Sequence, residues 1–168
     1  SLIVDRLKNN GAIIIGKTNT AELGVGGHTT NRLFGPTSNP YDLNKSAAGS
    51  SGGAGSAVAA ELLPFADGTD MMGSCRAPAA FANIYGYRPT TGLIPTDRSN
   101  EKNISNFPIL TSPGCFAKNP QDMAILLDCI IGSDPLDPLS IDINGSFKEN
   151  ELTDKQFSNI KIGWLKDM

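Results

Sequence analysis

Two short segments rich in glycine and serine constrain this chain more than any other feature of its sequence. They span residues 49–56, Gly-Ser-Ser-Gly-Gly-Ala-Gly-Ser, and residues 68–76, Gly-Thr-Asp-Met-Met-Gly-Ser-Cys-Arg. Because glycine has no Cβ, clustered glycines indicate backbone that approaches another group closely. Alanine-rich stretches at residues 52–63 and 77–83 predict helices that pack tightly against their neighbours. The pattern therefore predicts two tight turns, each opening a helix.

Both turns place a serine beside unshielded backbone N–H groups. Ser50 stands at the start of the first helix, where those N–H groups and the helix dipole favour negative charge. The second segment predicts a strand that ends in a turn, with a helix beginning just after Ser74. A serine held exposed there, with several amides directed at one small volume, fits a nucleophile beside an oxyanion hole. Helix capping alone explains an isolated serine such as Ser56 or Ser99, whereas two such turns together favour catalysis.

The composition excludes several other kinds of site. The 14 basic and 17 acidic residues give a net charge of −3, which argues against a nucleic acid or an anionic membrane as the main partner. With His28 as its one histidine, the chain offers no histidine-rich metal site. No apolar run reaches the roughly 20 residues of a membrane span. The three scattered cysteines, Cys75, Cys115 and Cys129, are too far apart for a zinc ribbon and predict reduced thiols in a cytoplasmic protein.

Hydrophobic patterning predicts an α/β fold. The apolar run at residues 12–16 predicts a strand buried on both faces, as in a parallel sheet covered by helices. Residues 25–56 and 133–153 are dominated by turn-formers and predict irregular structure. The remaining predicted strands are residues 64–68, 84–87 and 160–165, and the remaining predicted helices are residues 1–10, 19–24 and 120–131, the last capped by Asn119.

The sequence at residues 11–18 matches the phosphate-loop pattern letter for letter, but its context is wrong. That loop wraps a phosphate with consecutive N–H groups after a strand and before a helix. Here the variable positions are Ala-Ile-Ile-Ile, which favour a strand, and the preceding element is a predicted helix. We therefore interpret the match as a coincidence.

The stretch from Gly49 to Thr91 resembles the amidase signature family of serine amidohydrolases. The resemblance is carried by Gly-Ser-Ser-Gly-Gly at residues 49–53 and by Gly-Thr-Asp-x-x-Gly-Ser-x-Arg-x-Pro-Ala at residues 68–79. It extends outward through residues 16–19, 34–37, 39–41 and 86–90 and so covers nearly the whole chain. It implies an α/β/α fold with a mixed, twisted sheet covered by helices.

The resemblance also implies a Ser–cis-Ser–Lys triad. Ser74 corresponds to the nucleophile, and Ser50, preceded by a cis peptide bond, corresponds to the serine that bridges it to the lysine. The backbone amides of Met71, Met72, Gly73 and Ser74 correspond to the oxyanion hole. This chemistry hydrolyses carboxylic amides through an acyl-enzyme and requires neither histidine nor a metal or other cofactor. His28 is then a loop residue near the site at best.

The chain departs from the family pattern in two respects. Met72 stands where most members carry glycine, so its side chain is expected to narrow the acyl pocket or make it more apolar. The family's lysine lies on a strand upstream of the first helix, and Lys17 is not its counterpart. Residues 1–168 are therefore expected to be the central segment of one amidase-signature domain, without the lysine-bearing and C-terminal parts. By itself this segment is expected to have little or no amidase activity.

Three functions remain open from the sequence. The leading one is a stand-alone amidase acting on a small-molecule amide, as a monomer or a homodimer. The second is the glutaminase component, or A subunit, of a tRNA-dependent amidotransferase, which releases ammonia from glutamine for its partner subunits without binding nucleic acid directly. The third is a non-catalytic module that presents the glycine turns as a binding surface. The residues that would select the substrate cannot be named from the sequence.

Overall fold

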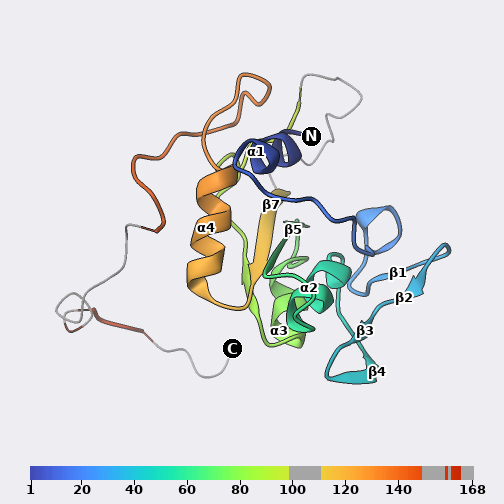
Figure 1. Cartoon of the computed structure of the whole chain (residues 1–168). Coiled ribbons are helices and arrows are strands. Elements are labelled where there is room, and N and C mark those ends of the chain that lie inside the picture. Colours follow the sequence, from blue (N-terminus) through green and yellow to red (C-terminus); the bar gives the residue numbers. More distant parts are fainter. Residues whose placement is uncertain (99–110, 149–157, 159, 164–168) are drawn as a thin grey trace.

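The computed structural model describes residues 1–98, 111–148, 158 and 160–163, and a three-stranded sheet lies at its centre (Figure 1). The strand order is β5-β7-β6, and both outer strands run antiparallel to β7. In this register Phe65 lies opposite Ala117 and Tyr87 lies opposite Cys115. The three strands are β5 (Phe65–Asp70), β6 (Tyr85–Tyr87) and β7 (Ser112–Ala117).

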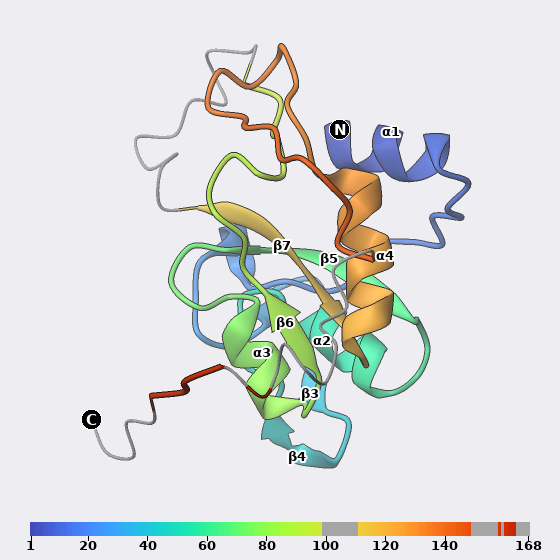
Figure 2. The ribbon, with the colours of Figure 1, turned by 90° about the vertical axis from the view of Figure 1, so that its left-hand side faces the viewer.

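Successive residues of β7 point to opposite faces of the sheet, and each face carries its own apolar core. Cys115 and Ala117 pack with a cluster that includes Met123, Leu126 and other side chains of α4 (Pro120–Ile130). Phe116 packs on the other face, with residues of α2 (Gly52–Ala59) and α3 (Arg76–Phe81). Figures 1 and 2 show α4 on one side of the sheet and α2 and α3 on the other. The predicted α/β class is therefore confirmed.

The central strand β7 is an element that the sequence did not predict. Residues 112–117, Ser-Pro-Gly-Cys-Phe-Ala, contain proline and glycine and lack a strand-like alternation of polar and apolar residues. All six are nevertheless buried. A Cβ at Gly114 would collide with the carbonyl oxygen of Tyr87, so glycine is required where β6 passes. Close packing between neighbouring strands, rather than local preference, selects the residues of this strand.

Helix α4 begins as predicted. The Asn119 side chain accepts a hydrogen bond of 2.7 Å from the backbone amide of Asp122, and Pro120 occupies the first turn. The helix ends at Ile130, two residues before Gly132, whose φ of +101° suits glycine. The residues after it form no helix or strand through 148, in line with the predicted connector.

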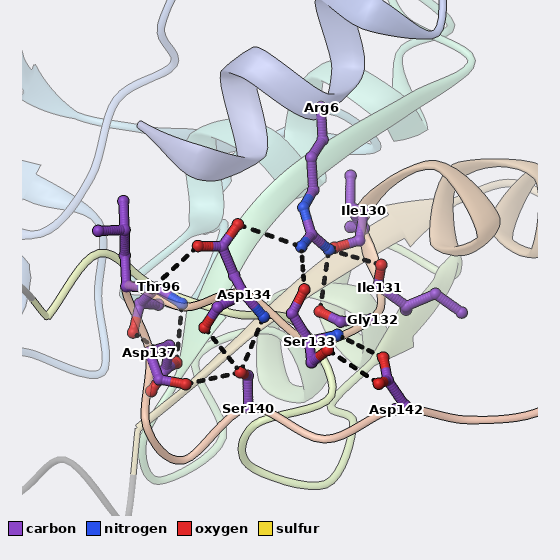
Figure 3. Close-up of polar contacts among 11 residues, drawn as sticks. Arg6, Thr96, Ile130, Ile131, Gly132, Ser133, Asp134, Asp137, Ser140 and Asp142 are labelled. Atoms are coloured by element: carbon purple, nitrogen blue, oxygen red, sulfur yellow. Dashed lines mark hydrogen bonds and ion pairs between the residues drawn. The ribbon is translucent and has the colours of Figure 1, made fainter.

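The C-terminal end of α4 is held by α1 (Leu2–Asn9), the predicted first helix (Figure 3). Nη1 of Arg6 donates to the backbone carbonyls of Ile130, Ile131 and Gly132 at 3.0, 2.5 and 3.0 Å, and Nη2 donates to that of Ser133 at 2.8 Å. The last carbonyls of a helix lack partners within the helix, and a cation there complements the helix dipole. Arg6 therefore docks α1 onto the end of α4.

Two small hairpins lie within the stretch that was predicted to be irregular (Figure 1). In the first turn the Asn31 side chain accepts hydrogen bonds from the amides of Leu33 and Phe34, which is a typical asparagine turn. The helix predicted at residues 19–24 is reduced to a 3-10 turn, Glu22–Gly24. The hairpins pair β1 (Thr30–Asn31) with β2 (Gly35–Pro36) and β3 (Ser38–Asn39) with β4 (Asp42–Ser46).

The strand predicted at residues 12–16 is wrong. Those residues belong to no strand, and the side chains of Ile13 and Ile15 are 87% and 72% exposed. An apolar run becomes a buried strand only where other strands pair with it and helices cover it. No such neighbour pairs with this run in the described part of the chain. The strand predicted at residues 160–165 is also wrong where it can be assessed: residues 160–163 are exposed and irregular, and 164 and 165 lie outside the described residues.

The other predicted elements are confirmed with shifted ends. The first alanine-rich helix stops at Ala59 instead of residue 63, and the second is shorter than predicted. These helices pack closely, because a Cβ at Gly55 would lie 3.1 Å from the Cβ of Pro78. Within the described residues, no helix combines the length and apolar character that crossing a bilayer requires.

Candidate active site

The first serine turn is buried and contains a cis peptide bond between Gly49 and Ser50. This bond is the one that the family resemblance implied. Ser50 is 4% exposed, and its backbone carbonyl accepts a hydrogen bond of 3.0 Å from the amide of Ala21. A Cβ at Gly49 would lie 2.9 Å from backbone atoms of Gly26 and His28, so only glycine fits against that loop. The turn is therefore held by a segment more than twenty residues upstream.

The second serine turn is built around the buried carboxylate of Asp70, at the end of β5. Its oxygens accept hydrogen bonds from the backbone amides of Gly73, Cys75 and Arg76 at 2.8, 3.1 and 3.3 Å. The Arg76 guanidinium adds two more, both of 3.0 Å. The carboxylate thus fixes the backbone immediately before and after Ser74.

This environment decides the charge of Asp70. Burial raises the pKa of its carboxyl, but hydrogen bonds from Arg76 and from the backbone amides of Gly73, Cys75 and Arg76 outweigh burial and hold the pKa well below its usual range. Arg88 also approaches, with its Nε 3.4 Å from Oδ1 of Asp70. Asp70 is therefore ionised at neutral pH, and its buried carboxylate pairs with Arg88, which is partly buried, and with Arg76, which is exposed.

Hydrogen bonds join the two turns directly. The backbone amide of Ser51 donates to the backbone carbonyl of Ser74 at 3.3 Å. The Ser51 hydroxyl donates to the carbonyl of Thr69 and accepts from its amide, both at 3.3 Å. A Cβ at Gly68 would lie 3.1 Å from the Ser51 hydroxyl oxygen, so the glycine of β5 admits this contact. The structure therefore brings the turns that carry Ser50 and Ser74 together.

The four backbone amides that the resemblance assigns to an oxyanion hole differ in whether they already donate a hydrogen bond. The Gly73 amide donates to Asp70, whereas the amides of Met71, Met72 and Ser74 donate to no group among the described residues. Gly73 has a φ of +114°, a conformation that favours glycine. Three of the four predicted donors thus have no partner among the described residues, and the fourth is bonded to Asp70.

The hydroxyl groups of Ser50 and Ser74 make no hydrogen bond to any described residue. Ser74 is half-buried, so its hydroxyl keeps access to solvent next to the free amides. The relay from Ser74 to Ser50 and on to a lysine therefore stays a prediction. Lys17 is exposed and makes no ion pair or side-chain hydrogen bond within the part of the chain that the structure describes.

His28 lies in the loop that packs against Gly49, and its Nδ1 is 2.8 Å from the Ser46 hydroxyl oxygen. An open cavity of about 470 Å³ borders this loop, lined by Glu22, Val25, Gly26, Gly27, His28, Thr30, Asn31 and Arg32. Among the described residues, no group of three or more histidine, cysteine or acidic side chains is arranged to hold a metal ion.

Asp70 and Arg76 shape the site, although from the sequence they were named only as letters of a motif. The sequence did hold a signal for their structural role, because Asp70 precedes the turn and Arg76 follows it. A buried carboxylate needs a cation and amide donors nearby, and this spacing offers both. Arg88 carried no such signal, because its approach depends on the neighbouring strand β6.

Comparison with known proteins identifies the family of this chain. The family model for amidases matches residues 1–168. The A subunit of the glutamyl-tRNA(Gln) amidotransferase from Sulfolobus acidocaldarius is 41% identical over 99% of this chain and 34% of its own length. The acylamidase of Rhodococcus erythropolis is 45% identical over 100% of this chain and 34% of its own length.

A solved structure shares the fold as well. It is a bacterial aryl acylamidase described as belonging to the amidase signature family, with a TM-score of 0.80 and 35% sequence identity, over 88% of this chain and 30% of that one. The chain spans about a third of the length of the curated relatives that it matches. On sequence and structure alike, this chain belongs to the amidase signature family.

Proposed function

We propose that this chain carries the nucleophile, the bridging serine and the oxyanion donors of a hydrolase that cleaves carboxylic amides. One observation carries the proposal: the hydrogen bond from Ser51 to Ser74 joins the buried Ser50 turn to a serine whose neighbouring amides are free. In this proposal residues 1–168 form the central segment of a single amidase-signature domain.

The proposed reaction is an acyl transfer. A neutral lysine accepts the proton of the Ser50 hydroxyl while Ser50 accepts that of Ser74, and the Ser74 Oγ attacks the amide carbonyl. The amides of Met71, Met72 and Ser74 stabilise the oxyanion of the tetrahedral intermediate. The C–N bond then breaks as the nitrogen takes the proton back through Ser50, and ammonia or an amine leaves. Water hydrolyses the acyl-enzyme to the free acid and restores the Ser74 hydroxyl.

A fluorophosphonate probe tests this proposal in the full-length gene product. We expect covalent labelling, with the modified peptide containing Ser74, and loss of labelling in Ser74→Ala. Residues 1–168 alone should label far more slowly, because a serine without a base is a poor nucleophile. Absence of labelling in the folded full-length protein would refute the hydrolase and leave the binding module as the function.

The second candidate, the glutaminase component of an amidotransferase, is favoured by the named function of several relatives, including that of S. acidocaldarius at 41% identity. It predicts glutaminase activity that rises when partner subunits and charged tRNA are added. Hydrolysis of diverse amides without such a rise favours the stand-alone amidase, which acts alone or as a homodimer. The unpaired cysteines, two of them buried, support a cytoplasmic location for either enzyme.

A further inference from the structure

Thr29 is a buried polar residue outside both serine turns, directly before β1, and its side chain contacts the backbone of the first serine turn. It is 1% exposed. Its hydroxyl donates to the carbonyl of Ala48 at 2.8 Å, lies 3.2 Å from the carbonyl oxygen of Ser50, and accepts from the amide of Gly52 at 2.8 Å. One hydroxyl thus contacts the backbone two residues before Ser50, at Ser50 itself, and two residues after it.

These contacts replace a helix cap. Ser51 is the N-cap residue of α2, but its side chain caps no amide of that helix, because its hydroxyl is bonded to Thr69 of β5. The first amide of a helix has no partner within the helix and needs one from elsewhere. Thr29 supplies that partner to Gly52 from 23 positions away in the sequence.

The lack of a side chain at Gly52 makes room for the Thr29 side chain. A Cβ at Gly52 would overlap the Thr29 hydroxyl and lie 2.9 Å from its Cβ. The Thr29 backbone is anchored as well, since its amide donates to Ala48 at 3.0 Å and its carbonyl accepts from Thr37 at 2.8 Å. The backbone of Thr29 is therefore fixed on both sides of its side chain, and this holds the hydroxyl against the turn.

We propose that Thr29 is a positioning residue for the bridging serine: its hydroxyl fixes the backbone of residues 48–52 and thereby the place of the Ser50 hydroxyl. This inference rests on the proposed function. Small displacements matter in such a relay, because a misplacement of about 1 Å in a catalytic group can slow a reaction about a hundredfold. Removing the hydroxyl also leaves the buried amide of Gly52 without its partner, and the turn must rearrange to satisfy it.

Three substitutions in the full-length gene product separate positioning from stability. Thr29→Val keeps the shape and removes the hydroxyl, Thr29→Ser keeps the hydroxyl, and Ser56→Ala is the matched control. Ser56 lies on α2, and its substitution by alanine removes one hydrogen bond, of 3.2 Å to the carbonyl of Ser38. The readouts are the rate of fluorophosphonate labelling at Ser74, kcat and KM, and the melting temperature.

We expect Thr29→Val to lower the labelling rate and kcat by about tenfold to a hundredfold, with KM nearly unchanged. Thr29→Ser, which keeps the hydroxyl, should have a labelling rate and a kcat close to those of the wild type. Ser56→Ala should lower the melting temperature without slowing labelling. A folded Thr29→Val that labels at the wild-type rate would overturn the proposal. If that variant does not fold, Thr29→Ala, which also removes the hydroxyl, replaces it, and a wild-type labelling rate there likewise overturns the proposal.

A crystal structure of Thr29→Val keeps this inference separate from the proposed function. Displacement of the Ser50 turn supports a positioning role, and an unmoved Ser50 overturns it, whether or not the protein hydrolyses amides. Failure of the proposed function would appear differently, as a folded wild-type protein that the probe does not label.

Discussion

The backbone amide of Ser51 donates a hydrogen bond of 3.3 Å to the backbone carbonyl of Ser74. Through this bond the start of α2 and the turn that carries Ser74 form one unit, although the residues lie far apart in the sequence. Neither hydroxyl of the proposed pair takes part in it, so both stay available for proton transfer. The distance between the two serines is thus set by backbone contacts, which side-chain substitution at Ser50 or Ser74 leaves in place.

That arrangement predicts separable effects of the two serines. In the full-length gene product, Ser74→Ala should abolish amide hydrolysis, because no acyl-enzyme can form. Ser50→Ala should lower kcat by about 10²–10⁴-fold, the range for loss of a positioned proton-transfer group. Steady-state kinetics with a simple amide measures both. Melting temperatures close to that of the wild type are the control, and a Ser50→Ala variant with unchanged kcat would remove Ser50 from the mechanism.

Replacing Asp70 by asparagine should destabilise the chain by about 2 kcal/mol, because the amides of Gly73 and Cys75 lose their charged acceptor. The pH dependence has a definite sign. The pKa of Asp70 is lower in the folded state than in the unfolded state. Its contribution to the free energy of unfolding is therefore complete above about pH 4 and is lost as the pH falls toward the folded-state pKa. Urea unfolding at pH 7, 4 and 3 measures the free energy of unfolding.

The wild type should lose stability over that acid range, and Asp70→Asn should lose less. Part of the loss remains in the variant, since hydrogen bonds also hold the pKa of Asp128 and Asp137 below the ordinary value against the opposing effect of burial. Asp67→Asn is the matched control, because Asp67 lies on the same strand but is exposed. Equal slopes for wild type and Asp70→Asn would show that the ion pair contributes nothing to acid sensitivity.

Met72 is predicted to influence which acyl groups are accepted. Its side chain is 85% exposed and lies two residues from Ser74, with its amide free. Met72→Gly removes apolar surface beside the nucleophile and should reduce kcat/KM for long apolar acyl amides, relative to short ones, by up to about tenfold. Competition between acetyl and hexanoyl anilides measures this ratio. A ratio unchanged by the substitution would mean that the side chain does not line the acyl pocket.

Arg6→Met should lower the free energy of unfolding by about 2 kcal/mol while preserving the apolar stem of the side chain. The guanidinium supplies hydrogen bonds to four backbone carbonyls at the end of α4, and bonds from charged donors are stronger than neutral ones. Lys8→Met, an exposed position on the same helix, is the control. Equal urea midpoints for both variants would contradict the role assigned to Arg6.

The three thiols should react at different rates. Burial raises the pKa of Cys115 to about 12 and raises that of Cys75 even further, which leaves both as unreactive thiols at neutral pH. Cys129 is half-buried and should be the first to react with a chromogenic disulfide reagent. We expect fast reaction of one thiol in the native protein and of all three in urea. Rapid native modification of Cys75, identified by peptide mass, would contradict the packing of α3 against the sheet.

Local sequence signals identified the elements whose formation depends mainly on nearby residues. The cap at Asn119 and the apolar face that follows it specify α4, because a helix satisfies its own backbone hydrogen bonds. The glycine–serine clusters likewise indicated two turns that open helices. These features, and the family resemblance that they carry, can be predicted from the sequence alone.

Strands were less predictable, because a strand depends on partners elsewhere in the chain. The isoleucines at residues 13–15 have the composition of a buried strand yet lie exposed, whereas residues 112–117 look unsuited to a sheet and form its central strand. Local composition therefore predicts the opposite of what forms, since pairing and coverage come from distant segments.

The sequence by itself therefore determined which residues are candidates for the chemistry: two serines in glycine turns. Only the tertiary structure decided how they are held. In the folded chain the Ser51 amide donates a hydrogen bond to the Ser74 carbonyl, and the Gly73 amide donates to Asp70. The Thr29 hydroxyl lies against the Ser50 turn. The physical reason is that buried backbone groups must find partners, and in these turns those partners come from segments that only the fold brings near.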